Sequence, residues 1–161
     1  MELNLKNITI LICSVFLFSA CIEKALSIDK KYAKLEQMSF EVVEKDLQLE
    51  GEFPDQLKKL IKKWFNTKVK INGLDGKMVF YISDYREDIS KINDGKRVDL
   101  YVKFRVVIKK QSNSKERVIT GKIKSYGTLV GTFSLNDFDV LIENTQIDLI
   151  TRLSRDLKSN I

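Results

Sequence analysis

A single run of alternating side chains constrains the fold of this chain more than any other feature. Between Val98 and Ile108 every second residue is apolar, and polar or charged residues fill nearly all the positions between them. Alternation over this length is typical of a β-strand with one buried and one exposed face, as antiparallel sheets have. The apolar face of this strand therefore needs a second layer to cover it.

Other strands are predicted around this run. Residues 118–133 follow a polar loop at 111–117 and are expected to return antiparallel to it. Glycines interrupt the return strand and are interpreted as bulge or bend positions: Gly121, Gly127 and Gly131. Weaker strand patterns occupy residues 40–49, 69–71 and 77–83. Between the last of these and the long strand, the acidic residues from Asp84 to Asp94 are interpreted as a solvated loop.

Two amphipathic helices are predicted. The first follows Pro54, and its apolar residues recur at helical spacing: Leu57, Leu60, Ile61, Trp64 and Phe65. The second follows a Ser-x-x-Asp capping pattern at Ser134 and Asp137, and it runs to the end of the sequence. The simplest packing is an α+β fold, a two-layer sandwich in which both helices cover one face of an antiparallel sheet of about four strands.

The first 21 residues resemble an export signal. Lys6 precedes an apolar run from Ile8 to Phe18, which is shorter than the roughly 20 residues that a spanning helix needs. A positive start, a short apolar run and small residues near a cleavage site are typical of secretory signals. Phe18-Ser19-Ala20-Cys21 resembles a bacterial lipobox, in which leucine is usual where Phe18 stands. The resemblance implies cleavage before Cys21 and lipidation of its thiol. The alternative is an ordinary signal peptide, or an anchor helix with an incidental cysteine.

This interpretation divides the chain into three parts. Residues 1–20 are the expected lipoprotein signal peptide, residues 21–38 a lipidated N-terminus and tether, and residues 39–161 a single α+β periplasmic domain. In some bacteria an Asp after the lipidated cysteine retains a lipoprotein in the inner membrane. This chain has Ile22 there. The expected location is therefore the outer membrane, facing the periplasm.

Composition argues against several kinds of chemistry. The chain has no histidine, and of its two cysteines Cys13 leaves with the signal while Cys21 would carry lipid. A histidine-based triad, a histidine metal site and a free thiol nucleophile are then excluded. The serines lack a Gly-x-Ser-x-Gly setting, and the acidic residues do not match a calcium loop. We expect no enzymatic activity, no metal and no cofactor; a lipid-anchored hydrolase is the rival hypothesis.

The exposed face of the long hairpin is the candidate binding surface. The formal charge is +6, and it stays so after loss of the signal, which carries one Lys and one Glu. Cations and a tyrosine are expected on the sheet face away from the helices: Lys103, Arg105, Lys122, Lys124 and Tyr101. Such a face suits an anionic lipid, lipopolysaccharide (LPS) or an acidic partner; the alternative is an ordinary solvated surface. An exported chain would not meet nucleic acid, so nucleic-acid binding is not expected.

The order of elements resembles two related families of envelope lipoproteins. The patterns that carry the resemblance are the Pro54–Phe65 helix, the Arg97–Ile108 strand, Gly121 and Tyr126 on the return strand, and the Leu-Ser-x-Asp-Leu ending of the last helix at Leu153–Leu157. One family is the LPS-assembly lipoprotein, which partners an outer-membrane β-barrel. The other is the auxiliary lipoprotein of ABC-type lipid or solvent transporters. The resemblance implies a non-enzymatic accessory of lipid transport or LPS assembly with an envelope protein partner. A pilot or structural lipoprotein for an outer-membrane channel is a further alternative.

Overall fold

The structure is a computed structural model that describes residues 32, 34–110, 112 and 115–161. The predicted signal peptide, Cys21 and most of the predicted tether lie outside these residues. The chain divides into two compact units, Met1–Lys34 and Leu35–Ile161, and every helix and strand named below belongs to the second. Within the described part, none of the helices combines the length and apolarity that a bilayer crossing requires.

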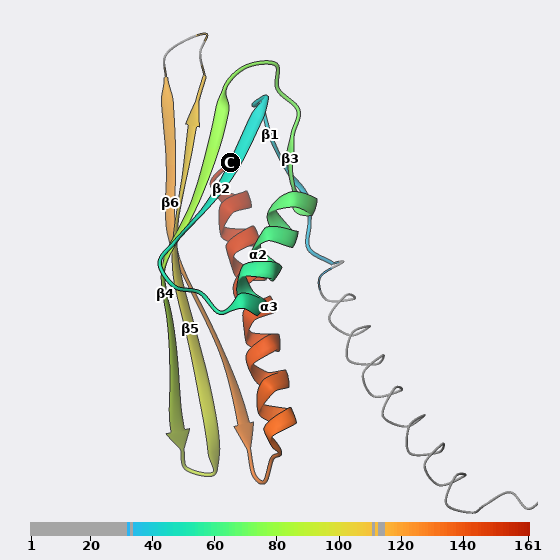
Figure 1. Cartoon of the computed structure of the whole chain (residues 1–161), viewed down its shortest axis with the longest axis vertical. Helices are drawn as coiled ribbons and strands as arrows, with labels where there is room; N and C mark the ends of the chain where they lie inside the picture. The colour runs from blue at the N-terminus through green and yellow to red at the C-terminus, as the bar shows by residue number, and fades with distance from the viewer. Residues whose placement is uncertain (1–31, 33, 111, 113–114) are drawn as a thin grey trace, which may run out of the picture. The chain divides into compact units, whose positions relative to one another are not determined.

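A four-stranded sheet and two helices form the two layers of the second unit (Figure 1). The sheet order is β2 (Glu44–Glu50), β4 (Lys77–Ile92), β5 (Gly95–Lys109) and β6 (Glu116–Val130). Helices α2 (Asp55–Lys68) and α3 (Leu135–Ser159) lie on the same side of this sheet. A small parallel pair, β1 (Met38–Phe40) and β3 (Val69–Ile71), completes the fold. The predicted α+β sandwich is confirmed, although β2 pairs parallel with β4 while the other pairings of the main sheet are antiparallel.

Strand β5 has the predicted orientation. Its even-numbered residues from Val98 to Val106 are buried on the helix side, where Phe104 stacks on Phe80 with ring centroids 6.0 Å apart. The predicted core residue Trp64 of α2 is fully buried and meets Phe80 edge-on at 5.4 Å. Aromatic side chains from both layers therefore join the sheet to α2, and contacts of this kind stabilise beyond the area they bury.

Two interpretations of the strands before β5 are wrong. The segment predicted as one strand at 40–49 contributes to two strands in different sheets, β1 and β2. The acidic residues from Asp84 onward belong mainly to β4 instead of a loop, because β4 continues through a bulge between Ser83 and Arg86. Asp84 adopts a φ of 54° there. A bulge adds one residue to one strand, so the alternation of side chains shifts and no longer shows the period of a single strand.

The glycines of β6 have a different role from the predicted one. The β5–β6 register runs without a shift from Lys109–Glu116 to Gly95–Val130, so Gly121 and Gly127 mark no bulge. A Cβ added at Gly121 would lie 2.3 Å from Cε1 of Phe104, and one at Gly127 would lie 2.6 Å from Cδ1 of Leu141. These two glycines leave room for a core ring and for α3.

Lys45 of β2 secures the end of helix α2. Its ammonium group donates hydrogen bonds to the carbonyl oxygens of Phe65, at 3.0 Å, and Val69. Partial burial, and secondarily the charge of Lys70, lower the pKa of Lys45. A cation is favourable at this end of a helix because the last carbonyl groups have no partner within the helix. The edge strand and the helix are thereby held together by a polar contact.

Ser134→Ala should destabilise the domain at the start of α3. The predicted capping pattern is present: the Ser134 hydroxyl accepts from the Asp137 N–H, and Asp137 accepts from the Ser134 N–H at 2.8 Å. We expect a loss of about 1 kcal/mol in urea unfolding at pH 7, as for other N-caps. The Ser134 hydrogen bonds lower the pKa of Asp137, so its contribution is present above the usual pKa of Asp and is lost as pH falls through the lowered value. Equal stability of wild type and variant at pH 7 would contradict this role, and Ser134→Thr is the control that keeps the cap.

Candidate functional site

The predicted binding residues lie together on the outer face of the sheet, away from the helices. Three neighbouring rows cross strands β4, β5 and β6 there: Arg86–Tyr101–Lys124, Ser83–Lys103–Lys122 and Tyr81–Arg105–Thr120. All five residues proposed from the sequence occupy these rows. Arg105, Lys122 and Lys124 are exposed, while Tyr101 and Lys103 are half-buried.

Two of the four predicted cations already have partners within the domain. The ammonium of Lys103 lies 2.5 Å from a carboxylate oxygen of Asp84, the residue at the bulge of β4. This pair lowers the pKa of Asp84 and raises that of Lys103, mainly through the hydrogen bond between them. The guanidinium of Arg105 lies 4.2 Å from the centre of the Tyr81 ring, within the range of a cation–π contact. Neither group is fully available to a ligand.

Lys122 and Lys124 are the other two predicted cations of this face. Within the described residues neither forms a salt bridge. Hydrogen bonds from Arg97 are the main cause that lowers the pKa of Asp99, and the charge of Lys124 lowers it further. The Lys124 ammonium lies 5.9 Å from the centre of the Tyr101 ring, and the guanidinium of Arg86 lies 5.8 Å from it. Lys124 of β6 and Arg86 of β4, neither of which forms a salt bridge within the described residues, thus lie beside the Tyr101 ring, and Lys122 lies in the next row.

The same two lysines line two hollows. One lies on the outer face and also includes Arg86, Asp88 and Tyr101. The other runs between β6 and α3. Its α3 cations are Arg152, which lies 2.7 Å from Asp148, and Arg155, which forms no ion pair within the described ranges. Ammonium and guanidinium groups arranged in this way can hold phosphate or carboxylate groups through charge-assisted hydrogen bonds.

Sequence reasoning missed several residues of these hollows. Arg86 lies among the acidic residues interpreted as a loop, whereas in the structure Arg86, Asp88 and Ser90 continue the outer-face alternation after the bulge. Arg155 lies on α3, and no spacing along the chain relates a helix residue to Lys122 of β6. Among the described residues, no group of acidic side chains is arranged to hold a metal ion.

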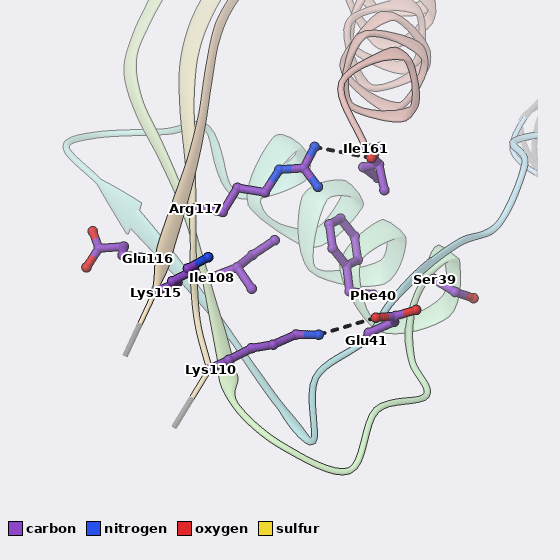
Figure 2. Close-up of a pocket in the computed structure, with 9 residues that line it drawn as sticks. All are labelled: Ser39, Phe40, Glu41, Ile108, Lys110, Lys115, Glu116, Arg117 and Ile161. Carbon is purple, nitrogen blue, oxygen red and sulfur yellow. Dashed lines mark hydrogen bonds and ion pairs between the residues drawn. The ribbon is translucent and has the colours of Figure 1, made fainter. Parts of the chain in front are cut away.

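A third hollow lies where the ends of β5 and β6 approach the loop after β1 (Figure 2). Figure 2 shows Lys110 directed toward Glu41 and Arg117 directed toward Ile161. Lys110 pairs with Glu41 at 3.3 Å, and Arg117 donates to the carbonyl oxygens of Asn160, at 2.6 Å, and Ile161, at 3.1 Å. These cations are occupied by groups of the same domain. The hollow is therefore a weaker candidate for an anionic ligand than the face that bears Lys122 and Lys124.

Comparisons with known proteins concern the fold. No protein-family model matches the sequence, and no curated protein matches it significantly. The structure is similar to a minor lipoprotein from Acinetobacter baumannii, with 14% identity over 73% of this chain and 91% of that one and a TM-score of 0.51. It is also similar to rare lipoprotein B from Shewanella oneidensis, with 12% identity over 73% of this chain and 95% of that one and a TM-score of 0.48. Both neighbours are bacterial lipoproteins by name. At this identity, the first likeness establishes a shared fold.

Proposed function

We propose that this protein is a lipoprotein of the bacterial envelope that is anchored through Cys21. Its outer sheet face binds anionic amphiphiles or a protein partner. Its role is that of a non-enzymatic accessory in lipid transport or LPS assembly, in the outer membrane and facing the periplasm. The observation that carries the proposal is the unpaired charge of Lys122 and Lys124 beside the Tyr101 ring. The lipobox-like sequence at residues 18–21 supports the anchor.

An anionic amphiphile suits this face for physical reasons. Each lysine close to an anionic membrane surface contributes about 1 kcal/mol of attraction. The ring of Tyr101 offers an apolar body next to the cations, as amphipathic aromatic side chains do at membrane interfaces. A lipid anchor would keep the domain close to such headgroups. The absence of histidine and of a free thiol in the mature sequence supports a binding role over a hydrolytic one.

Identifying the protein partner distinguishes between the three roles that the resemblance and its alternative imply. Crosslinking in intact membranes to an outer-membrane β-barrel would support a role in LPS assembly. Crosslinking to an inner-membrane transporter or its binding protein would support the auxiliary role in ABC-type lipid or solvent transport. An outer-membrane channel subunit as partner would support a pilot or structural lipoprotein.

Reversing two charges tests recognition by the outer face. In the fragment 35–161, Lys122→Glu with Lys124→Glu should weaken binding to LPS or anionic vesicles at least about tenfold, because two attractive charges become repulsive. The effect should shrink as salt rises, since exposed charges are screened over about 10 Å at 0.1 M. Vesicle cosedimentation at low and high salt measures both. Lys103 stays unchanged, because a glutamate there would face Asp84.

The matched control carries the same change of charge elsewhere. Lys59 and Lys62 are exposed on α2. Lys59→Glu with Lys62→Glu should leave vesicle binding within about twofold of wild type, and thermal melting should change little in either variant. Equal loss in both variants would indicate attraction by net charge alone. Unchanged binding of the β6 variant would reject recognition by this face.

A further inference from the structure

Strand β6 has a free edge. It is the last strand of the main sheet, and within the described chain no strand pairs with its outer side. Two hydrogen bonds establish which backbone groups face that side: the N–H of Lys110 donates to the carbonyl of Lys115 at 3.4 Å, and the N–H of Gly131 donates to that of Asp94 at 2.7 Å. Hydrogen-bonded and non-bonded pairs alternate along an antiparallel ladder. Because the register between these bonds is unbroken, the odd-numbered residues of β6 bond to β5.

The even-numbered residues of β6 therefore direct their N–H and C=O groups away from the sheet. Thr120, Lys122, Lys124 and Tyr126 belong to this set, and their side chains are all exposed. The hollow between β6 and α3 is lined by Lys122 and Lys124 on the strand and by Arg152, Arg155 and Asp156 on the helix. Backbone groups that no neighbouring strand of the described chain pairs with thus lie next to Lys122 and Lys124, over consecutive even positions of the strand.

We propose that an extended, acidic segment of a protein partner adds to this edge as a further strand of the sheet. Its backbone would pair with the outward N–H and C=O groups of β6, and its carboxylates would face Lys122 and Lys124. Backbone pairing supplies affinity in strand addition, and alternate side chains supply specificity. This inference rests on the proposed function only in assuming a protein partner; it requires neither the lipid anchor nor amphiphile binding.

Charge decides in favour of an acidic partner over a second copy of this chain. Two β6 strands paired antiparallel about this stretch would place lysine against lysine, and like charges directly opposite one another are destabilising. Lysines on exposed edges are a common protection against self-pairing for this reason. The other free edge, on β2, is shorter, with 7 residues against 15 in β6. An acidic strand paired with β6 would place carboxylates opposite its lysines in place of like charges, and it would pair along the longer of the two free edges.

Thr120→Pro tests how much the backbone hydrogen bonds of β6 contribute to binding of the acidic segment. The N–H of Thr120 faces the free edge and makes no ladder bond, and its exposed side chain forms no hydrogen bond within the described residues. Proline removes this donor and places its ring on the docking side, while the bonds from β5 remain; edge strands tolerate proline at such positions. Thr120→Val keeps the N–H and is the matched control. Neither variant changes the charge of the face.

The probe is a capped nonapeptide in which glutamates alternate with valine and threonine, beside a matched peptide with lysine in place of each glutamate. The full chain in non-ionic detergent micelles is titrated with each peptide, and amide hydrogen exchange is followed by NMR. The acidic peptide should slow exchange of the Thr120, Lys122 and Lys124 amides about tenfold or more, because they gain hydrogen bonds. The lysine peptide should not. Thr120→Pro should weaken binding of the acidic peptide at least about fivefold, with Thr120→Val within about twofold.

Several results would overturn the proposal. These are equal binding of the two peptides, no protection of the even-numbered amides, or wild-type binding by Thr120→Pro. Protection that grows with protein concentration without peptide would assign the edge to a second copy of the chain. Protection by anionic vesicles alone would assign it to the membrane. Loss of vesicle binding on reversal of the lysine charges tests the proposed function separately, because Thr120→Pro leaves those charges in place.

Discussion

Phe104→Ala should lower the free energy of unfolding by about 3–5 kcal/mol, as other deletions of a core ring do. Phe104 is 2% exposed, stacks on Phe80 and covers Gly121 across the β5–β6 pair. The variant leaves a cavity between the sheet and the helices, which the rigid layers fill only in part. Urea unfolding followed by circular dichroism measures the loss. A loss below about 1 kcal/mol would mean that the core does not depend on this ring.

Gly121 offers an internal control for this prediction. Gly121→Ala alone should destabilise by about 1–3 kcal/mol, because its Cβ would overlap the Phe104 ring. In the double variant Phe104→Ala with Gly121→Ala, the new methyl group enters space that the ring has left. The combined loss should therefore be smaller than the sum of the two single losses. Simple additivity would show that the ring and the glycine are not coupled as the structure places them.

Cys21→Ala should abolish fatty-acid labelling of the protein completely. The thiol is the group to which lipid would be attached, and alanine offers no nucleophile for that step. We expect an unprocessed precursor or a soluble periplasmic form, measured by metabolic labelling with a radioactive fatty acid and by cell fractionation. Cys13→Ala is the matched control, because Cys13 lies within the apolar run and should be removed with the signal. Label retained by the Cys21 variant would reject the anchor, and so would loss of label in the Cys13 variant.

The parts of the fold that were predictable are those in which local pattern and burial agree. The alternation around Phe104 predicts which face of β5 is buried, since a slip of one residue would expose every apolar side chain of the strand. The pattern at Ser134 and Asp137 predicts the start of α3 because a cap is a local interaction. The order of β2, α2 and β4 suits a parallel crossover. β2 is nevertheless a short edge strand with no fully buried residue, so its own pattern does not show that it pairs with β4.

The candidate site was predictable as a face but not in its internal pairing. Alternation places Lys103, Lys122 and Lys124 on the side away from the helices. It does not show that Lys103 is bound to Asp84, because that contact depends on a bulge in a neighbouring strand. As a result, the sequence suggests a set of equivalent cations, whereas the structure divides them into paired and unpaired groups. The proposed binding surface therefore lies nearer the β6 edge, at Lys122 and Lys124, than the sequence alone suggests.

The two glycines of β6 that leave room for Phe104 and α3, Gly121 and Gly127, also favour one register of the β5–β6 hairpin over others. A slip of β6 by two residues against β5 would keep every side chain on its proper face, so hydrophobic pattern alone does not forbid it. It would, however, bring Ile119 or Ile123 to the place of Gly121, opposite Phe104. The bulk added there would collide with the ring, and α3 could not dock at its present depth. Gly121 and Gly127 thus specify the register of the β5–β6 hairpin. A hairpin in the wrong register would not allow α3 to pack against the sheet.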